Sequence, residues 1–443
     1  MKFIYGLLIF LMSVSMLFAK KTIDEDRYFP DYPADKDMTT YNKDENPLNK
    51  GIQYGGWITP IMLYQQDTVQ SLATSQNTAL IWFKSYLWDN TFFYLRGKYT
   101  FMANYYKKNY PVDTIYNLPT IDMAFIKMGF MKSTIELYLG RKYFTIGSGL
   151  VLNGKGDGIE FKFNSKYINV QVLGAYSGLI VNEANPYNLS TQDYQNGSRR
   201  IFTGGTLSTT FFNQSFYILA LAQFDLGSDA SDRYFSQYYG AGFKGVILDF
   251  WVYQAEYIYE TGGSSYSSSI SAMAASLKMD FYISTLLKPV IHFHYHYGSG
   301  DSDRNNHMTP SGNTPGSVDN GFIGLGTFVA GYALRPLPGN LHALRLGFTL
   351  SPFSWAKELF VKKMTLTIKY SLYFKDKTNS PISISDAPVD NVFVGQGLDF
   401  SYKWKIFSDL SFYATYAFFI AGDAYPTGTE LEHFFTGGLN LSF

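Results

Sequence analysis

The stretch "MTLTIKYSLYFK", Met364–Lys375, alternates apolar and polar side chains along its whole length. Its even-numbered positions are Met, Leu, Ile, Tyr, Leu and Phe, and its odd-numbered positions are Thr, Thr, Lys, Ser, Tyr and Lys. Successive side chains of a β-strand point to opposite faces, so this stretch would have one apolar and one polar face. A helix would scatter both sets around its circumference. The pattern therefore predicts a strand between an apolar and an aqueous surrounding.

The same alternation recurs in "GIEFKFNS" (Gly158–Ser165), "LDFSYKWK" (Leu398–Lys405) and "KPVIHFHYHYGSGD" (Lys288–Asp301). The expected strands reach about ten residues, whereas strands of globular proteins average about 5–6. Aromatic residues make up 18% of the chain and charged residues only 16%, against about 25% charged in ordinary soluble domains. Long strands with Phe-, Tyr- and Trp-rich apolar faces are typical of a lipid-facing wall. We therefore predict an all-β transmembrane antiparallel β-barrel.

The joins between the expected strands alternate in length, with short turns on one side and long polar loops on the other. This is the sidedness of outer-membrane barrels, which have short periplasmic turns and long extracellular loops. An unpaired backbone group costs several kcal/mol in hydrocarbon, so the sheet must close on itself. About eighteen strands enclose a lumen too wide for side chains to fill. The expected strands are 51–63, 78–89, 92–103, 119–130, 134–146, 157–164, 167–176, 201–212, 215–225, 234–247, 250–260, 269–283, 289–297, 341–351, 360–375, 393–405, 410–420 and 433–443.

The N-terminus predicts export. Lys2 precedes the mostly apolar stretch Phe3–Phe18, and Ala19 is a small residue suited to cleavage. A run of this length is short for a spanning helix, although a retained membrane anchor is the alternative. We expect a signal peptide at 1–19, an acidic periplasmic segment at 20–50 and the barrel at 51–443.

The final stretch "GGLNLSF" has an alternating apolar face and ends at Phe443. Outer-membrane barrels commonly end in this way, and their assembly machinery recognises that strand, so this machinery is an expected partner. The alternative is an ordinary terminal strand that happens to end in Phe. We expect the protein in the cell outer membrane, in contact with the lipid bilayer and with lipopolysaccharide or an equivalent outer leaflet.

Overall composition excludes several classes of protein. Lys+Arg and Asp+Glu are both 36, and no cysteine is present. The balanced charge indicates no nucleic-acid partner. The lack of cysteine excludes a disulfide scaffold, a cysteine nucleophile and thiolate metal sites. We expect no cofactor.

Three stretches resemble the alginate export porin family. They are "LYLGRKYFTIGSGLVLNGKGDGIEF" (137–161), "WVYQAEYIYETG" (251–262) and "YHYGSGD" (295–301). The resemblance covers roughly residues 134–303. It implies an eighteen-stranded monomeric barrel with a basic lumen. The member that gives the family its name passes an anionic polysaccharide outward, but the substrate does not carry over from the resemblance alone.

The polar faces of the expected strands carry more bases than acids. A channel with low-dielectric walls focuses such a field, so we expect a modest preference for anions. The alternative is that these charges pair across strands and only keep the wall wet. Arg141 has the strand parity of Leu139, so a bulge near Gly140 is expected to turn it inward. The residues predicted to line the pore are Lys84, Arg96, Lys98, Arg141, Glu160, Lys162, Glu256, Lys278, Asp280, His292, His294, His296, Arg345, Lys369, Asp399, Lys403 and Lys405, with Glu136 and Lys363 as further polar-face charges.

Two motifs could hold a metal ion. His292, His294 and His296 share a strand face at a spacing of about 6.6 Å, which two imidazoles can bridge. No carboxylate stands near them in sequence on that face, so we interpret them as lumen wall and predict no metal site. Asp301 and Asp303 have a calcium-like spacing but lack the rest of an EF-hand, so a turn is expected and bound calcium is left open.

The predicted function is passive passage of small or oligomeric hydrophilic solutes through an outer-membrane porin-like channel. Anions are favoured, anionic saccharides among them. The segment Gly298–Asn340 is long enough to fold inward and constrict or plug the lumen. An adhesin or structural barrel with a plugged lumen is one alternative, and a barrel enzyme is another, although no Ser/His/acid set is evident.

Overall fold

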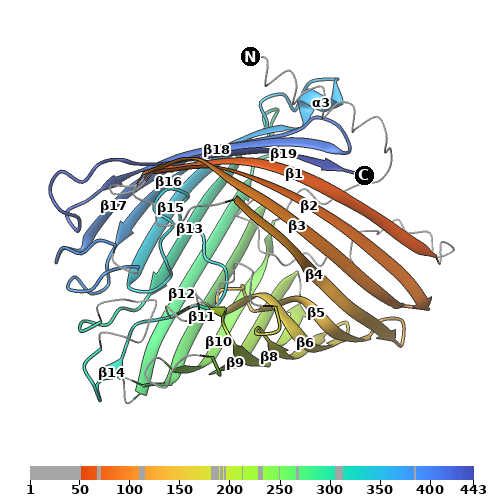
Figure 1. The fold of residues 1–443 in the computed structure, drawn as a ribbon, viewed down its shortest axis with the longest axis horizontal. Coiled ribbons are helices and arrows are strands. Elements are labelled where there is room, and N and C mark those ends of the chain that lie inside the picture. Colours follow the sequence, from red (N-terminus) through yellow and green to blue (C-terminus); the bar gives the residue numbers. More distant parts are fainter. Residues whose placement is uncertain are drawn as a thin grey trace.

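A closed antiparallel β-barrel of eighteen strands is the fold of this chain in the computed structural model (Figure 1). The predicted fold class is therefore confirmed. The structure describes residues 51–66, 71–108, 115–180, 189, 193, 196–211, 213–227, 233–248, 250–265, 269–304, 313–383 and 386–443. The expected signal peptide at 1–19 and the acidic segment at 20–50 lie outside the described residues.

Each wall strand pairs with its neighbours in chain order, so the barrel is a continuous meander. The short β14 (Val318–Asp319) is not part of this wall, because it pairs in parallel with β12 and lets β13 pair directly with β15. The single described helix with printed bounds, α3 (Leu359–Lys362), lies in the turn before β16. The wall strands are β1 (Ile52–Gln66), β2 (Ser71–Trp88), β3 (Thr91–Lys108), β4 (Ile115–Phe130), β5 (Ile135–Ile146), β6 (Leu152–Asn164), β7 (Ile168–Tyr176), β8 (Arg200–Phe211), β9 (Gln214–Asp225), β10 (Tyr234–Ile247), β11 (Trp251–Ser264), β12 (Ser269–Tyr282), β13 (Val290–Gly298), β15 (Leu341–Leu350), β16 (Met364–Phe374), β17 (Phe393–Lys405), β18 (Leu410–Ala421) and β19 (Glu432–Ser442).

The barrel closes where β1 pairs with β19, and Figure 1 shows these strands side by side. At this seam the amide of Gly56 donates to the carbonyl of Phe443 at 2.9 Å, and the amide of Phe443 donates back at 3.0 Å. A Cβ atom on Gly56 would lie 2.5 Å from the carbonyl oxygen of Leu80 and 2.7 Å from the Phe443 ring. Glycine therefore permits the close approach that removes the last open edge of the sheet.

The two faces of the wall differ as expected for a barrel in lipid. Large apolar side chains such as Ile81, Ile218 and Ile291 are exposed on the outer face. Their strand neighbours Leu80 and Leu219 on the inner face are buried, and Leu219 packs with apolar side chains of segments that lie inside the barrel. No helix in the described part of the chain has the length and apolarity that a membrane span requires.

Strand boundaries depart from the prediction mainly at the extracellular end. β2 begins at Ser71 rather than near 78, β4 begins at Ile115 rather than near 119, and β6 begins at Leu152 rather than near 157. The stretch "SLATSQN" before residue 78 has no apolar alternation. Strand pairing there continues past the lipid, so no apolar face is needed and the sequence signal disappears. At the other end, α3 occupies the first residues of the strand expected from 360.

Candidate functional site

The tip of the β5–β6 hairpin, residues 142–156, leaves the barrel wall and lies in the lumen. Pairing of β5 with β4 stops at Arg141, and pairing of β6 with β7 stops at Asp157, whereas β5 and β6 stay paired with each other up to Ile146 and Leu152. The tip packs as a buried apolar cluster with inner-face side chains of β7–β12. We call this segment the hairpin tip.

A second inward segment, residues 313–340, crosses the lumen. Phe322 and Leu325 pack with the hairpin tip, whereas Tyr332 and Leu334 pack with inner-face side chains of β15–β19. The amides of Gly326 and Thr327 donate to carbonyls of the hairpin tip, each at 3.0 Å. We call this segment the crossing loop. The described part of Gly298–Asn340 therefore does fold inward.

Two carboxylates on β11 fix these two segments. Glu256 accepts the amide of Ser148 in the hairpin tip at 2.7 Å and the hydroxyl of Tyr217 at 2.7 Å. Glu260, four residues further along the same face of β11, accepts the amide of Ile323 in the crossing loop at 2.9 Å. Both carboxylates are buried. Glu256, predicted to line the pore, is on the inner face and holds the hairpin tip inside the barrel.

A cluster of bases and acids lies on the inner face of β3, β4 and the hairpin tip. Asp122 forms ion pairs with both Arg96 and Lys155. The β3–β4 register shifts here, since Arg96 pairs with Met123 and Gly97 with Ile121. Asp122 is thus the extra residue of a β-bulge, which turns its side chain inward. Sequence reasoning missed both Asp122 and Lys155. The bulge breaks the alternation around Asp122, and Lys155 lies in the hairpin tip, which leaves the wall.

Further along the same wall, Glu160 is shared by two lysines. Lys142 lies 2.5 Å from its carboxylate and Lys162 lies 3.4 Å away. The ring of Tyr138 carries the ammonium groups of Lys142, Lys162 and Lys127 at 4.6–5.5 Å from its centroid. Cations over aromatic faces are stabilised by the ring quadrupole. This wall therefore combines basic groups with aromatic surface.

Lys84 continues this arrangement on β2. Its ammonium lies 4.5 Å from the ring centroids of both Tyr86 and Phe92. Arg96 lies 5.5 Å from the ring of Trp57. We call this surface the β2–β6 wall. Its inner-face bases are Lys84, Arg96, Lys98, Lys127 and Lys162, its inner-face acids are Asp122, Glu136 and Glu160, and Lys142 and Lys155 of the hairpin tip lie against it.

A second basic wall lies across the ring of strands, on β12–β17. Arg345 pairs with Asp399 at 2.7 Å and donates to the carbonyl of Val329 in the crossing loop at 3.1 Å. The inner-face bases of this β12–β17 wall are Lys278, Arg345, Lys369, Lys403 and Lys405, and its acids are Asp280 and Asp399. Lys363 stands at the end of α3, before β16.

The three histidines of β13 share the inner face, but they have different surroundings. His292 lies 2.6 Å and His294 3.2 Å from the same oxygen of Asp280. His296 is buried under the crossing loop, 4.3 Å from the ring of Phe328. No carboxylate stands near these histidines in sequence, but strand pairing brings Asp280 of β12 into register with His292.

Arg141 does not reach the lumen in the way the sequence predicted. The β4–β5 and β5–β6 ladders run through Gly140 without a register shift, although Gly140 has φ +124. The expected bulge at Gly140 is therefore absent, and the bulge lies on β4 at Asp122 instead. Arg141 keeps the parity of Leu139, and Asp157 neutralises it at 2.8 Å.

Asp301 and Asp303 hold a turn at the start of the long extracellular loop. Asp301 accepts the amides of Asn320 at 2.6 Å and Asp303 at 3.1 Å. Asp303 accepts the amide of Thr314 at 3.1 Å. Burial and the neighbouring carboxyl raise the pKa of Asp301, while the hydrogen bond from Asp301 lowers the pKa of Asp303 to about 2. These contacts support the turn interpretation.

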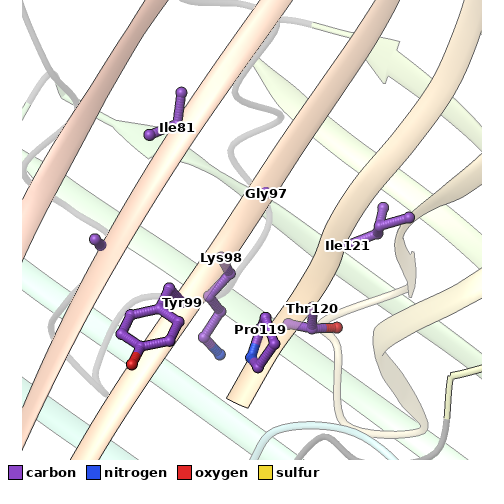
Figure 2. A pocket seen from close by; sticks show the side chains of 8 residues that line it. Ile81, Gly97, Lys98, Tyr99, Pro119, Thr120 and Ile121 are labelled. Carbon is purple, nitrogen blue, oxygen red and sulfur yellow. The ribbon is translucent and has the colours of Figure 1, made fainter. Parts of the chain in front are cut away.

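A hollow of about 480 Å³ lies on the outer face of β2–β4, at the level of the bulge. Figure 2 shows Ile81, Tyr99 and Ile121 around Gly97, which contributes no side chain. Most of its lining is apolar, from Ala79, Ile81, Tyr99, Pro119 and Ile121, and residues Lys98 and Thr120 border it as well. This hollow is therefore not part of a path for hydrophilic solutes, which must run inside the barrel.

Comparisons with solved structures support the fold. The chain is similar to OccK11 (OpdR) of Pseudomonas aeruginosa, with 10% identity, a TM-score of 0.57 and coverage of 88% of this chain and 96% of that one. It is similar to the outer membrane protein OprD of Pseudomonas aeruginosa, with 13% identity, a TM-score of 0.55 and coverage of 88% and 94%. For OccAB3 of Acinetobacter baumannii the identity is 13%, the TM-score 0.55 and the coverage 88% and 99%.

The family is shown by sequence. No curated protein matches this chain. The family model described as alginate export matches residues 167–434, which is more than half of the chain. Together with the closed barrel, this confirms the resemblance and the location in the outer membrane. The chain is a porin-like outer-membrane β-barrel and belongs to the alginate export family.

Proposed function

We propose that this protein is a passive outer-membrane channel that prefers anionic hydrophilic solutes, with acidic oligosaccharides as the best candidates. The observation that carries the proposal is the pair of basic walls, β2–β6 and β12–β17, that face each other across the lumen. On each wall the inner-face bases outnumber the inner-face acids. The hairpin tip packs along β7–β12, and the crossing loop runs from that side to β15–β19. The remaining space therefore borders the β2–β6 wall and the part of the β12–β17 wall that the crossing loop does not cover.

The acids on these walls are fewer than the bases, and two of them are each shared by two bases. Asp122 is shared by two bases, Arg96 and Lys155, and Glu160 by Lys142 and Lys162. One carboxylate between two cations leaves net positive charge in a site with low-dielectric walls. Such a site focuses the field and raises the local concentration of anions.

Aromatic side chains beside the bases support a saccharide rather than a simple ion. Tyr138, Tyr86 and Trp57 each lie within cation–π distance of an inner-face base. An acidic sugar presents a carboxylate and an apolar ring face together, and both groups find complementary surface on the β2–β6 wall. The family assignment supports the same class of solute, because alginate is an anionic polysaccharide.

Planar-bilayer recording tests the proposal. In a KCl gradient the reversal potential should have the sign of an anion-preferring channel. Uronate oligomers should block the current at lower concentration than neutral oligosaccharides of the same length. A cation-preferring reversal potential would overturn the proposal. Absence of any conductance from folded protein would favour the alternative, a structural barrel plugged by the crossing loop.

Recognition of the final strand by the outer-membrane assembly machinery stays a prediction. The Phe443 ring lies against Gly56 at the barrel seam. Its role can be tested with Phe443→Ala, by measuring how much folded barrel reaches the outer membrane.

A further inference from the structure

Three potential metal ligands converge on the inner face of the β12–β17 wall. One ligand atom from each of Asp280, His292 and His294 lies within 4.8 Å of the other two. Within the described ranges of the chain, this is the one group of three or more such side chains brought together in this way. We propose that these three side chains bind a divalent transition-metal ion of the Zn²⁺ class inside the lumen.

The strand register creates the cluster. Asp280 on β12 is the direct partner of His292 on β13, and His294 follows on the same face. Neighbouring strands lie about 4.8 Å apart and residues two apart on one strand about 6.6 Å apart. Side chains of imidazole length bridge both spacings, so their nitrogens can meet at one carboxylate. The arrangement therefore follows from backbone pairing rather than from flexible loops.

The donor set selects the class of metal. Two imidazole nitrogens and one carboxylate oxygen suit Zn²⁺ and its transition-metal neighbours, whereas Ca²⁺ and Mg²⁺ prefer oxygen ligands throughout. At Zn–ligand distances of about 2.0–2.1 Å, tetrahedral ligand atoms lie about 3.3 Å apart. The separation of 3.2 Å between His294 Nε2 and Asp280 Oδ1 fits this value. The separation of 2.6 Å between His292 Nδ1 and Asp280 Oδ1 has to open by about 0.7 Å, a small rotation of either side chain.

The second nitrogen of His292 already has a suitable partner. His292 Nε2 lies 2.8 Å from the hydroxyl of Thr349, which lies 2.7 Å from the hydroxyl of Thr367. Metal-bound histidines almost always use their other nitrogen in this way. Hydroxyls both donate and accept, so the two threonine hydroxyls can bond to His292 Nε2 in either tautomer. They can therefore hold the ring both when Nδ1 carries a proton toward Asp280 and when Nδ1 loses that proton to bind a metal.

Space and access are also suitable. Gly347 lies opposite His292, and a Cβ atom there would come within 3.1–3.2 Å of the His292 side chain. The side chains of His292, His294 and Asp280 are 16%, 22% and 27% exposed. Since they lie on the inner face, a metal bound there would keep open coordination positions toward lumen water.

Two lysines act against a bound cation. Lys278 is the strand partner of His294, and Lys369 stands opposite Gly347 on β16. Their charges lower the affinity of the site for any cation, because like charges repel across a few ångströms of low-dielectric surroundings. Replacing Lys369 by Gln should therefore tighten metal binding, an effect that a nonspecific carboxylate or histidine contact on the protein surface would not show.

Metal uptake by the full chain, folded in detergent, tests the site. After equilibrium dialysis against zinc, the wild-type barrel should retain one zinc ion per chain. His292→Ala combined with His294→Ala should abolish this uptake. The matched control, His342→Ala combined with His433→Ala, also removes two histidines and should retain the zinc. Heat-modifiable mobility in gel electrophoresis shows for every variant that the barrel is folded.

Two further variants distinguish a specific metal site from nonspecific binding of zinc. Thr349→Val should weaken zinc binding about tenfold, as loss of a ligand's supporting hydrogen bond typically does, and Thr349→Ser should restore it. Cobalt should give a visible absorption band with the wild-type protein that zinc abolishes. Zinc uptake that is unchanged in the double-histidine variant, or no uptake by folded wild-type protein, would overturn the proposal.

Discussion

Glu256 on β11 accepts two hydrogen bonds from Ser148, one from its amide at 2.7 Å and one from its hydroxyl at 2.5 Å. Residue 147 is glycine at φ +60, and a Cβ atom there would lie 2.3 Å from the Glu256 carboxylate. The hairpin tip can thus lie against β11 only with this glycine and this acid together. This contact fixes how much of the lumen the hairpin tip occupies.

We expect Glu256→Ala to release the hairpin tip. Each hydrogen bond to a charged group contributes about 1.5–3 kcal/mol, so docking of the tip should weaken by roughly 3 kcal/mol. Single-channel recording should show a larger and noisier open-channel current. Glu430→Ala, in the exposed β18–β19 loop, is the control and should leave the current unchanged. A current in Glu256→Ala equal to that of the wild type would mean that the hairpin tip does not limit conduction.

We expect Asp399→Asn to destabilise the barrel and to increase its anion preference. Arg345 is buried and pairs with Asp399, so the substitution leaves a buried cation without its counter-charge. Breaking such a pair typically costs about 3–5 kcal/mol. Thermal unfolding should occur at lower temperature, and the reversal potential should move further toward that of chloride. Asp409→Asn, in the β17–β18 turn outside the lumen, keeps the backbone carbonyl that Ser442 contacts and should change neither. An unaltered reversal potential in Asp399→Asn would argue that Arg345 is remote from the ion path.

The barrel could be predicted from the sequence because lipid imposes a periodic pattern on each strand. The stretch around Lys369 shows this pattern without interruption, and β16 runs from Met364 to Phe374 as one continuous strand. The alternation is absent where a strand extends beyond the lipid. β2 begins at Ser71, where both faces can meet water, and the sequence there has no alternation.

The interior of the lumen could not be predicted, because it depends on contacts between distant residues. The bulge at Asp122 places two consecutive residues inward, so strict alternation assigns its neighbours to the wrong face. Asp280 stands beside His292 because β12 pairs with β13 in this register. The two residues lie on either side of a turn, so their proximity depends on a register that the sequence does not show. Alternation places Lys142 on the inner face with Tyr138, and this signal could have identified it as a partner of Glu160.

We expect Gly56→Val to impair closure of the barrel. A side chain at this position would collide with the carbonyl of Leu80 on β2 and with the ring of Phe443. An open edge in hydrocarbon leaves several backbone groups unpaired, each costing several kcal/mol, so little folded protein should form. The yield of the heat-modifiable form measures this effect. Gly51→Val is the matched control, because nothing lies within 4 Å of a Cβ atom at Gly51. Equal yields from the two variants would show that the seam tolerates a side chain.

We expect Lys162→Gln combined with Lys403→Gln to reduce the anion preference. The two lysines stand on the inner faces of opposite basic walls, on β6 and β17, so their loss weakens the field across the whole lumen. Because the Debye length is about 10 Å at 0.1 M salt and about 30 Å at 0.01 M, the shift in reversal potential should be larger at the lower salt concentration. Lys166→Gln combined with Lys357→Gln removes the same charge from two periplasmic turns, outside the lumen. If both double variants shift the reversal potential equally, selectivity arises at the channel mouth rather than between the two walls.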